Sequence, residues 1–410
     1  MHDVLFLAHR LPFPPDKGDK IRSYHLLRHL TRTHRVHVGT FVDDPDDLRH
    51  LPALRELTGG DVYAPQLSPR WSRLRSLGGV LTGRSCTEVY YAHRGMAAWV
   101  QRVLWARSVN RAVVFSAAMA QYLANARGVR RVLDLVDVDS EKWREYARAR
   151  RGPAAAFYRR EADRLLAFER DMAARFEATV LVSAPEAALF RQRAPEVAGR
   201  VGVLGNGVDT AFFDPAQAGA DPYAGRGRQV VVFTGAMDYW PNAQAVTWFA
   251  EAVLPQIRAA VPEAQFYVVG RNPGRGVRHL SNCPGVTVTG TVPDVRPYLQ
   301  RAAVAVAPLK LARGVQNKVL EAMAMARPVV ASPQALEGLS VRVPDEALAA
   351  EGAAAFAEHV VACLRGQFPE LGAAARRAVL HEYSWDARLR GLDDLLGLPA
   401  RRAIPADAAS

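Results

Sequence analysis

Short apolar runs of four to seven residues alternate with longer amphipathic stretches along most of the chain. Runs of this length, bounded by polar or turn residues, are typical of strands buried on both faces of a parallel sheet. The predicted strands are residues 4–8, 36–42, 112–115, 131–136, 179–183, 230–234, 265–270, 286–292, 304–309 and 328–332. Strands that alternate with helices in this way predict an α/β protein with doubly wound parallel sheets.

The stretch from residue 304 to residue 332 carries the strongest functional pattern. A predicted strand is followed by a polar loop, residues 312–317, then by a helix from about Lys318 and by a second buried strand. In such units the helix N-terminus binds anions at the carboxyl edge of the sheet. Lys318 at this position suits a phosphate group, and Glu321, one helical turn further on, suits sugar hydroxyls.

This stretch resembles the donor-site motif of GT-B glycosyltransferases of the family 4 type. Those enzymes carry two glutamates, separated by seven residues, in the frame E-x7-EAMA-x-G-x-PVV. Here the second is Glu321, in LEAMAMARPVV, whereas Arg313 occupies the position of the first. The sequence RGVQNKVLEAMAMARPVVAS is most similar to that of the exopolysaccharide sugar transferases associated with the PEP-CTERM/exosortase system. The similarity extends from Leu5 to about Leu396.

The resemblance implies two Rossmann-like domains that face each other across a cleft, with a C-terminal helix that crosses back to the first domain. The expected parts are an acceptor domain (residues 1–208), a linker (209–228), a nucleotide-sugar domain (229–380), the crossover helix (381–398) and a disordered tail (399–410). The sequence VGVLGNGVD, residues 201–209, is similar to the turn that closes the first domain in this family. An Asn-Gly pair supplies a positive-φ turn, so we give this segment a structural role only.

The loop after the first predicted strand is a candidate anion site. It leads through Gly18, Lys20 and Arg22 into a helix that extends to about Leu30. Loop amides and basic side chains at a helix start form an anion nest, and in the resembling enzymes this loop lies near the donor phosphates and the acceptor. The alternative is an ordinary βα loop whose charges are solvated.

Asp137 leaves the predicted strand 131–136 in the sequence DLVDVDSEKW. The resemblance places a His near this strand end, close to the reacting sugar, so Asp137 is the candidate base or sugar contact. The alternative is a capping or loop carboxylate, and we expect Asp139 or Ser140 to cap the helix that follows. The pair Asp137 and Asp139 also fits a DxD metal motif, but that motif belongs to a different glycosyltransferase fold, and no metal site is expected.

The resemblance assigns further donor contacts to strand ends in the second half. Gly235 and Arg271 follow two predicted strands, and the backbone at Thr291 and Val292 would contact the nucleobase. Many relatives have an Arg just after the glycine at position 235 and a Lys a few residues later, and these two residues clamp the donor diphosphate. Both are missing here.

The implied reaction is sugar transfer from a nucleotide-diphosphate sugar, which is a co-substrate, with no further cofactor. Lys318 and Arg313 would replace the missing clamp and stabilise the leaving diphosphate, together with the loop amides of Gly314, Val315, Gln316 and Asn317. Glu321 would accept hydrogen bonds from the ribose. The family is retaining, but the loss of the first glutamate at Arg313 leaves the stereochemistry open, and the sequence identifies neither the base nor the sugar.

Three other functions compete with this one. A sugar-nucleotide 2-epimerase uses the same architecture without an acceptor, and a degenerate GT-B subunit would bind without catalysing a reaction. A basic nucleic-acid-binding protein is the third, but no helix-turn-helix, zinc or RNA-recognition signature is found in the sequence.

The basic residues are concentrated in the first half of the chain. Residues 1–200 hold 33 Lys and Arg against 22 Asp and Glu, or +11, whereas residues 201–410 hold 20 against 19, or +1. Residues 67–84 also form a basic amphipathic pattern, which fits either a helix on an anionic membrane or a packed helix with a solvated edge. A basic first domain fits a lipid-linked saccharide acceptor and peripheral contact with an anionic membrane.

Several absences in the sequence favour a cytoplasmic protein, at most peripheral at the inner face of the plasma membrane. The three cysteines are far apart and form no CxxC pair, so we expect reduced thiols. No signal-peptide pattern follows the short apolar run at residues 4–8. No apolar stretch reaches the ~18 residues of a membrane span.

Overall fold

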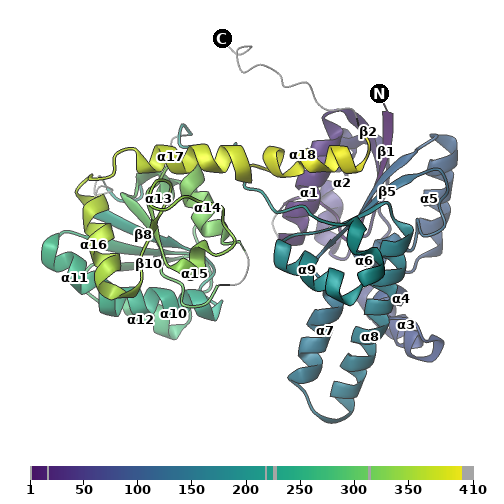
Figure 1. Ribbon diagram of the computed structural model, residues 1–410, viewed down its shortest axis with the longest axis horizontal. Helices are drawn as coiled ribbons and strands as arrows, with labels where there is room; N and C mark the ends of the chain where they lie inside the picture. Colours follow the sequence, from purple (N-terminus) through teal and green to yellow (C-terminus); the bar gives the residue numbers. More distant parts are fainter. Residues whose placement is uncertain (1, 16–17, 218, 225–228, 313–314, 399–410) are drawn as a thin grey trace. The chain divides into compact units, whose positions relative to one another are not determined.

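The computed structural model describes residues 2–15, 18–217, 219–224, 229–312 and 315–398. Contacts divide this chain into two compact units (Figure 1). Unit 1 comprises the chain up to Asn206 together with the segment that starts at Arg388, and unit 2 is Gly207–Ala387.

Unit 1 is built on a seven-stranded sheet in the order β3-β2-β1-β4-β5-β6-β7. Every neighbouring pair in it is parallel. Its strands are β1 (His2–Ala8), β2 (His34–Thr40), β3 (Gly59–Tyr63), β4 (Arg111–Phe115), β5 (Arg130–Val136), β6 (Ala178–Leu181) and β7 (Val201–Val203). The chain runs from β1 to β2 and β3 on one side and then returns to β4 on the other, so the topological switch point lies between β1 and β4.

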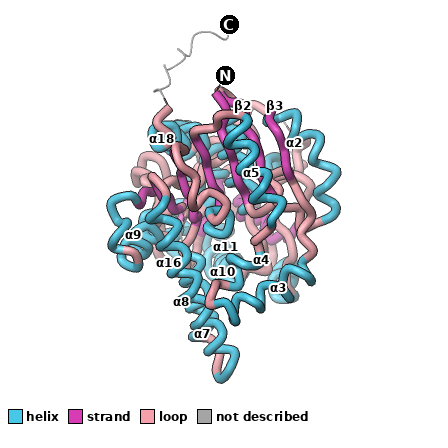
Figure 2. Tube along the Cα trace, turned by 90° about the vertical axis from the view of Figure 1, so that its right-hand side faces the viewer, coloured by secondary structure: helices cyan, strands magenta, loops and turns pink. Residues whose placement is uncertain are grey.

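Helices connect these strands, as the tube view shows (Figure 2). They are α1 (Gly18–Thr31), α2 (Leu51–Thr58), α3 (Pro69–Thr82), α4 (Cys86–Tyr90), α5 (Arg94–Ala106), α6 (Ala117–Ala120), α7 (Asp139–Arg148), α8 (Gly152–Arg175) and α9 (Ala184–Arg193), with 3-10 turns at Pro45–His50 and Pro195–Arg200. One hydrophobic cluster packs Leu5, Val114 and Leu133 of the central strands with Trp99 of α5 and Phe168 of α8.

Helix α8 supplies buried carboxylates to the starts of two other helices. Glu161 accepts hydrogen bonds from Ser85 Oγ (2.6 Å) and the Cys86 amide (2.7 Å) at the start of α4. Glu169 accepts from Ser140 Oγ (2.6 Å) and the Ser140 amide (3.2 Å) at the start of α7. The expectation that Asp139 or Ser140 caps α7 is therefore wrong: both residues are already helical, and the Glu169 carboxylate of α8 accepts from the Ser140 amide instead.

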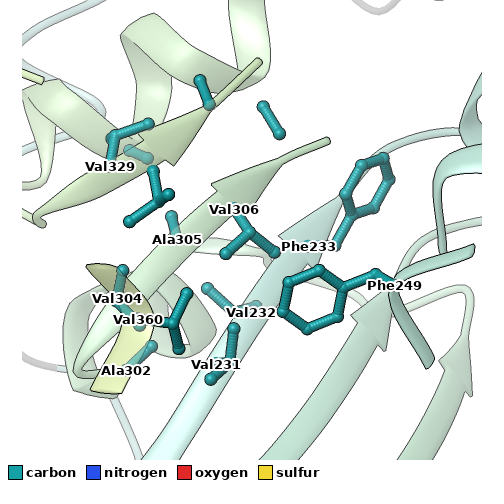
Figure 3. Close-up of a cluster of buried hydrophobic side chains, with 14 of the residues drawn as sticks. Val231, Val232, Phe233, Phe249, Ala302, Val304, Ala305, Val306, Val329 and Val360 are labelled. Atoms are coloured by element: carbon teal, nitrogen blue, oxygen red, sulfur yellow. The ribbon is translucent and has the colours of Figure 1, made fainter. Parts of the chain in front are cut away.

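Unit 2 contains a six-stranded parallel sheet in the order β10-β9-β8-β11-β12-β13. Its strands are β8 (Val230–Thr234), β9 (Gln265–Val269), β10 (Val286–Gly290), β11 (Val304–Ala307), β12 (Val329–Ala331) and β13 (Leu348–Ala349). The switch point lies between β8 and β11. Successive residues Val231, Val232 and Phe233 all belong to the buried cluster in Figure 3, because this strand is covered on both faces.

The helices of unit 2 include two that are joined by a π-helical turn. They are α10 (Trp240–Trp248), α11 (Leu254–Ala260), α12 (Arg275–His279), α13 (Arg296–Arg301), α14 (Asn317–Ala324), α15 (Pro333–Leu336), α16 (Gly352–Leu364) and α17 (Leu371–Ala378). The π-helical turn, Phe249–Val253, lies between α10 and α11. Pro255 is the second residue of α11 and has no amide hydrogen to donate to the helical ladder, which accounts for the irregular turn.

The expected fold class is confirmed: the chain is α/β, with two Rossmann-like parallel sheets, and its C-terminal segment returns to unit 1. Helix α18 (Trp385–Leu395) belongs to unit 1 from Arg388 onward. There, Asp393 pairs with His29 at 2.9 Å, and Arg130 Nε donates to the Leu395 carbonyl at 2.6 Å. Among the described residues, no helix is long and apolar enough to cross a bilayer.

Candidate active site

The switch point of unit 2 brings two glycine loops into close contact. Gly235 follows β8 with φ 156° and donates its amide hydrogen to the Val269 carbonyl at 3.0 Å. Gly270 follows β9 with φ 155°, and a Cβ at this position would lie 1.7 Å from the Gly235 carbonyl oxygen. Only glycine fits position 270, so the carboxyl ends of β8 and β9 are held together without side chains between them.

Lys318 reaches the same edge from the first turn of α14. Its Nζ donates a hydrogen bond to Asn242 Oδ1 and lies 4.8 Å from the centroid of the Phe233 ring at the end of β8. Asn242 is buried near the start of α10, and its Nδ2 donates to the Ala236 carbonyl at 2.9 Å. The three contacts fix the Lys318 ammonium beside the loop that follows β8.

Glu321 forms an electrostatic pair with Lys318. Burial lowers the pKa of Lys318 to about 8, and the negative charge of Glu321 opposes this shift. Burial likewise raises the pKa of Glu321 to about 7, opposed by the positive charge of Lys318. Both groups therefore titrate near neutrality, as is common for residues that bind or transform a charged ligand.

The loop before α14 leaves backbone donors without a side-chain cap. Gln316 is the N-cap residue with an extended backbone, and within the described part of the chain no side chain caps this helix. Asn317 is its first residue, and Val315 precedes the cap. The amides at an uncapped helix start are suited to an anion. Two of the expected donor residues, Arg313 and Gly314, lie outside the described residues.

The remaining donor candidates lie at the ends of neighbouring strands of the same sheet. The Arg271 carbonyl accepts a hydrogen bond from the Met237 amide at 2.8 Å, and the Arg271 side chain is exposed. Thr291 and Val292 follow β10; Thr291 is exposed, whereas Val292 is partly buried against the core. The structure thus places Gly235, Arg271, Thr291 and Lys318 along one carboxyl edge.

The two basic candidates of unit 1 have internal partners. Gly18 is the first residue of α1, and Lys20 is buried with its Nζ 2.9 and 2.8 Å from the two carboxylate oxygens of Asp47. Arg22 is only 1% exposed and donates to both carboxylate oxygens of Asp134, at 2.8 and 3.1 Å. Both charges are thus neutralised inside the unit, and a donor role for them stays a prediction.

Arg22 also holds the segment that precedes the boundary between unit 1 and unit 2 at Asn206. It donates to Asn206 Oδ1 at 2.9 Å and to the Leu204 carbonyl at 2.7 Å. Asn206 belongs to the turn sequence VGVLGNGVD, which the sequence had marked as structural. A Cβ on Gly207 would lie 2.6 Å from the Trp385 backbone, so this position requires glycine for packing.

Asp137 is presented by an unusual turn after β5. Val136 has φ 69°, and a β-branched residue in the left-handed region is a genuine conformational outlier. Its amide donates to Asp134 Oδ1 at 3.0 Å, which ties the turn to the buried pair with Arg22. The Asp137 carboxylate lies 2.9 Å from Lys142 Nζ, and its side chain is 36% exposed.

Two other residues lie at the carboxyl edge of unit 1, after β4 and β1. Ser116 follows β4 with φ 78°, and its amide donates to the Asp134 carbonyl at 2.8 Å. His9 follows β1 and stacks on Phe115, with ring centroids 5.7 Å apart and planes 6° from parallel. His9 and Ser116 flank the switch point between β1 and β4. Strained non-glycine residues cluster at functional sites, but the sequence patterns had singled out neither Ser116 nor Val136.

These sheets, with their ligand edges at two switch points, define the GT-B fold, and solved structures agree. HepE from Anabaena, in complex with UDP, shares 15% identity over 97% of this chain and 100% of its own, with a TM-score of 0.65. Sucrose-phosphate synthase from Thermosynechococcus elongatus shares 17% identity over 96% and 98%, with a TM-score of 0.60. WaaG, a glycosyltransferase involved in lipopolysaccharide biosynthesis, shares 16% over 96% and 100%, with a TM-score of 0.58. No curated protein sequence matches the chain.

The match to a protein family covers a smaller part of the chain, which lies in unit 2. Residues 228–366 match the model of the family described as glycosyl transferases group 1. The chain is therefore a GT-B protein whose second unit resembles the glycosyl transferases group 1 family over residues 228–366, and the matched segment contains Gly235, Asn242, Lys318 and Glu321.

Proposed function

We propose that the protein transfers a hexosyl group from a nucleotide-diphosphate sugar to a hydroxyl of a lipid-linked saccharide. The observation that carries this proposal is the position of Lys318, held by Asn242 at the switch point of the group 1 domain, beside the uncapped start of α14. A cation and the amides of a helix start at one edge match the two negative charges of a diphosphate.

The chemistry assigned to unit 2 is stabilisation of the leaving nucleoside diphosphate. Lys318 and the amides of residues 315–317 lie where negative charge would develop on the phosphates, and fixed donors of this kind lower the barrier without reorganisation. Glu321 would accept hydrogen bonds from the ribose hydroxyls. Arg313 and Gly314 are assigned to the same loop from the sequence alone.

The chemistry assigned to unit 1 is activation or positioning of the acceptor. The turn at Val136 presents Asp137 at the carboxyl edge, where it would accept the hydroxyl proton or hold the transferred sugar. In the ground state Lys142 shares this carboxylate, and an acceptor hydroxyl would compete with it. The anomeric configuration of the product, read by NMR, decides between retention and inversion.

The pathway assignment depends on the sequence similarity of residues 313–332 to exopolysaccharide sugar transferases, including those linked to exosortase systems. WaaG acts in lipopolysaccharide biosynthesis by its description, which is consistent with a saccharide acceptor. We place the reaction at the inner face of the plasma membrane, where a lipid-linked acceptor would be within reach of the basic unit 1.

Donor binding can be tested with a thermal-shift panel of UDP-, GDP- and dTDP-sugars, starting with UDP because HepE was solved with UDP and UDP-glucose. One donor class is expected to stabilise the protein. Lys318→Gln should abolish that shift, whereas Lys310→Gln, which changes an exposed lysine on the loop between β11 and α14, should retain it. A panel without any stabilising donor would remove the support for this function.

Product analysis after turnover distinguishes a transferase from a 2-epimerase and from a binding subunit. Incubation with the stabilising donor and a lipid extract should yield a sugar-modified lipid only when both are present. Release of an epimerised sugar from the donor alone would indicate a 2-epimerase instead. Donor binding with neither product would indicate a binding subunit.

A further inference from the structure

Helices α7 and α8 form an antiparallel hairpin that extends away from the sheet of unit 1, as both views show (Figures 1 and 2). Residues 143–160 form its outer end, which we term the hairpin tip. They contain six arginines and a single acidic residue, Glu145. No candidate catalytic residue belongs to the tip, so its charge needs a separate explanation.

Four of these arginines have no carboxylate partner in the described structure: Arg148, Arg150, Arg151 and Arg159, all of them exposed. The other two have partners. Arg144 pairs with Glu141 and Asp163, each at 3.1 Å, and Arg160 donates to backbone carbonyls. Four unpaired guanidinium groups within twelve residues make a site for anions, since arginine binds phosphate groups in a bidentate manner.

Aromatic rings accompany the charges at the tip. Trp143 lies 6.0 Å from Tyr146 and 5.7 Å from Tyr158, measured between ring centroids. Tyr146 is 55% exposed although it belongs to this cluster. Tyr and Trp have apolar bodies and polar ends, which is why they are enriched where a membrane meets water.

Helix α3 adds exposed aliphatic side chains next to the hairpin. Arg160 Nη2 donates to the carbonyls of Gly79 at 2.8 Å and Val80 at 3.1 Å, so the C-terminal end of α3 lies against α8. Val80 is 40% exposed, and Leu74 on the same helix is 61% exposed. Neither water nor a purely polar ligand stabilises these two apolar side chains.

We infer that the hairpin tip and the outer side of α3 form a docking surface for an anionic lipid bilayer. Unpaired arginines meet lipid phosphates, the aromatic rings lie at headgroup depth, and Leu74 and Val80 enter the apolar boundary. A nucleic acid would satisfy the arginines but would leave the aliphatic side chains in water. A bilayer is the partner that a lipid-linked acceptor requires, so this inference rests on the proposed function.

The test is co-sedimentation of the full-length protein with vesicles, without any donor. Phosphatidylcholine vesicles are compared with vesicles that also contain phosphatidylglycerol, and binding to the latter is expected to be much stronger. Each arginine near an anionic surface is expected to change binding by about fivefold, so Arg150→Glu with Arg151→Glu should weaken it by more than about 25-fold.

A matched control carries the same change of net charge elsewhere on unit 1. Arg102 and Arg127 are exposed, and Arg127 precedes β5, at the opposite edge of the sheet from the hairpin. Arg102→Glu with Arg127→Glu should leave vesicle binding unchanged. Leu74→Ser should weaken binding at high salt, where the electrostatic part is screened.

Three outcomes would overturn the inference: equal binding to both kinds of vesicle, equal losses for the two arginine pairs, or tight binding of duplex DNA that vesicles do not displace. The thermal shift with donor is measured on the wild-type protein as well. Absence of a donor shift together with preferential binding to the anionic vesicles would count against the proposed function alone, and a donor shift together with equal binding to both kinds of vesicle would count against the docking surface alone.

Discussion

Lys318 and Asn242 join the helices that follow the two strands at the switch point of unit 2. They are separated by 76 positions in sequence, yet the ammonium group donates directly to the amide oxygen. Helix α10 follows β8 and α14 follows β11, and these strands are neighbours in the sheet. The contact therefore places a positive charge at the one edge position where loops diverge to opposite sides and leave room for a ligand.

The Lys318–Asn242 contact should be visible as non-additive binding energies. Lys318→Gln should weaken nucleotide binding by about 10- to 100-fold, because hydrogen bonds to charged groups contribute about 1.5–3 kcal/mol. Asn242→Ala should weaken it less, because the ammonium group remains but is no longer held. Calorimetric titration of both single variants and the double variant measures the coupling. Strictly additive losses would mean that Asn242 acts independently of Lys318.

Donor affinity should depend on pH with a maximum between about 7 and about 8. Above pH 8 Lys318 loses its proton and its attraction for phosphate, and below pH 7 Glu321 gains a proton and accepts fewer hydrogen bonds. Titrations across this range should show both limbs. Lys318→Gln should remove the alkaline limb, and Glu321→Gln the acid limb. A profile that either variant leaves unchanged would contradict the assignment.

The same two shifts predict opposite effects on the stability of the ligand-free protein. The pKa of Lys318 is lowered by folding, so stability should rise with pH from about 8 towards the unfolded value of 10.5. The pKa of Glu321 is raised, so stability should fall as pH rises from 4.5 to about 7. Thermal midpoints of the wild type and Glu321→Gln, compared across the acid range, isolate the second effect.

Gly270→Ala should destabilise unit 2 severely. The added Cβ would lie 1.7 Å from the Gly235 carbonyl oxygen, and the backbone conformation is one that L residues rarely adopt. Such a clash between main-chain atoms costs at least about 3 kcal/mol and should lower the unfolding midpoint on the order of 10 °C. Gly276→Ala is the control, since a Cβ there meets nothing within 4 Å. Equal midpoints for the two variants would show that the loops can separate.

Removal of the Arg22 charge should cost about 3–5 kcal/mol, because Asp134 would remain buried without its partner. Arg22→Met with Asp134→Asn should recover part of this loss. Lys142→Gln, which breaks an exposed pair with Asp137, should cost less than about 1 kcal/mol. Calorimetric unfolding of Arg22→Met, the double variant and Lys142→Gln, each compared with the wild type, measures these effects. A double variant less stable than Arg22→Met would show that Asp134 has a further role in the turn at Val136.

Most strands were predictable because a strand that is buried on both faces consists of a continuous run of apolar residues. Three strands escaped prediction for identifiable reasons. Strand β3 begins with two glycines and lies at the sheet edge, while β7 and β13 contain only three and two residues. Such short segments have no periodicity that distinguishes them from loops.

The site was predictable only where its parts are close in sequence. Lys318 and Glu321 are one turn apart, so their order relative to the loop indicated a binding edge. The pairing of Arg22 with Asp134 joins residues 112 positions apart, and no local pattern indicates it. No sequence pattern indicated the positive φ of Val136. Its neighbours impose this conformation, and a β-branched residue disfavours it.

The two buried glutamates of α8 restrict how this protein can change its length during evolution. Glu161 and Glu169 each anchor the first turn of a different helix, and they do so from positions eight residues apart. One residue inserted between them would rotate one carboxylate by about 100° and leave a helix start without its anchor. Homologous chains should therefore vary in length at residues 149–151, where the hairpin turns, and keep the spacing of these two glutamates constant.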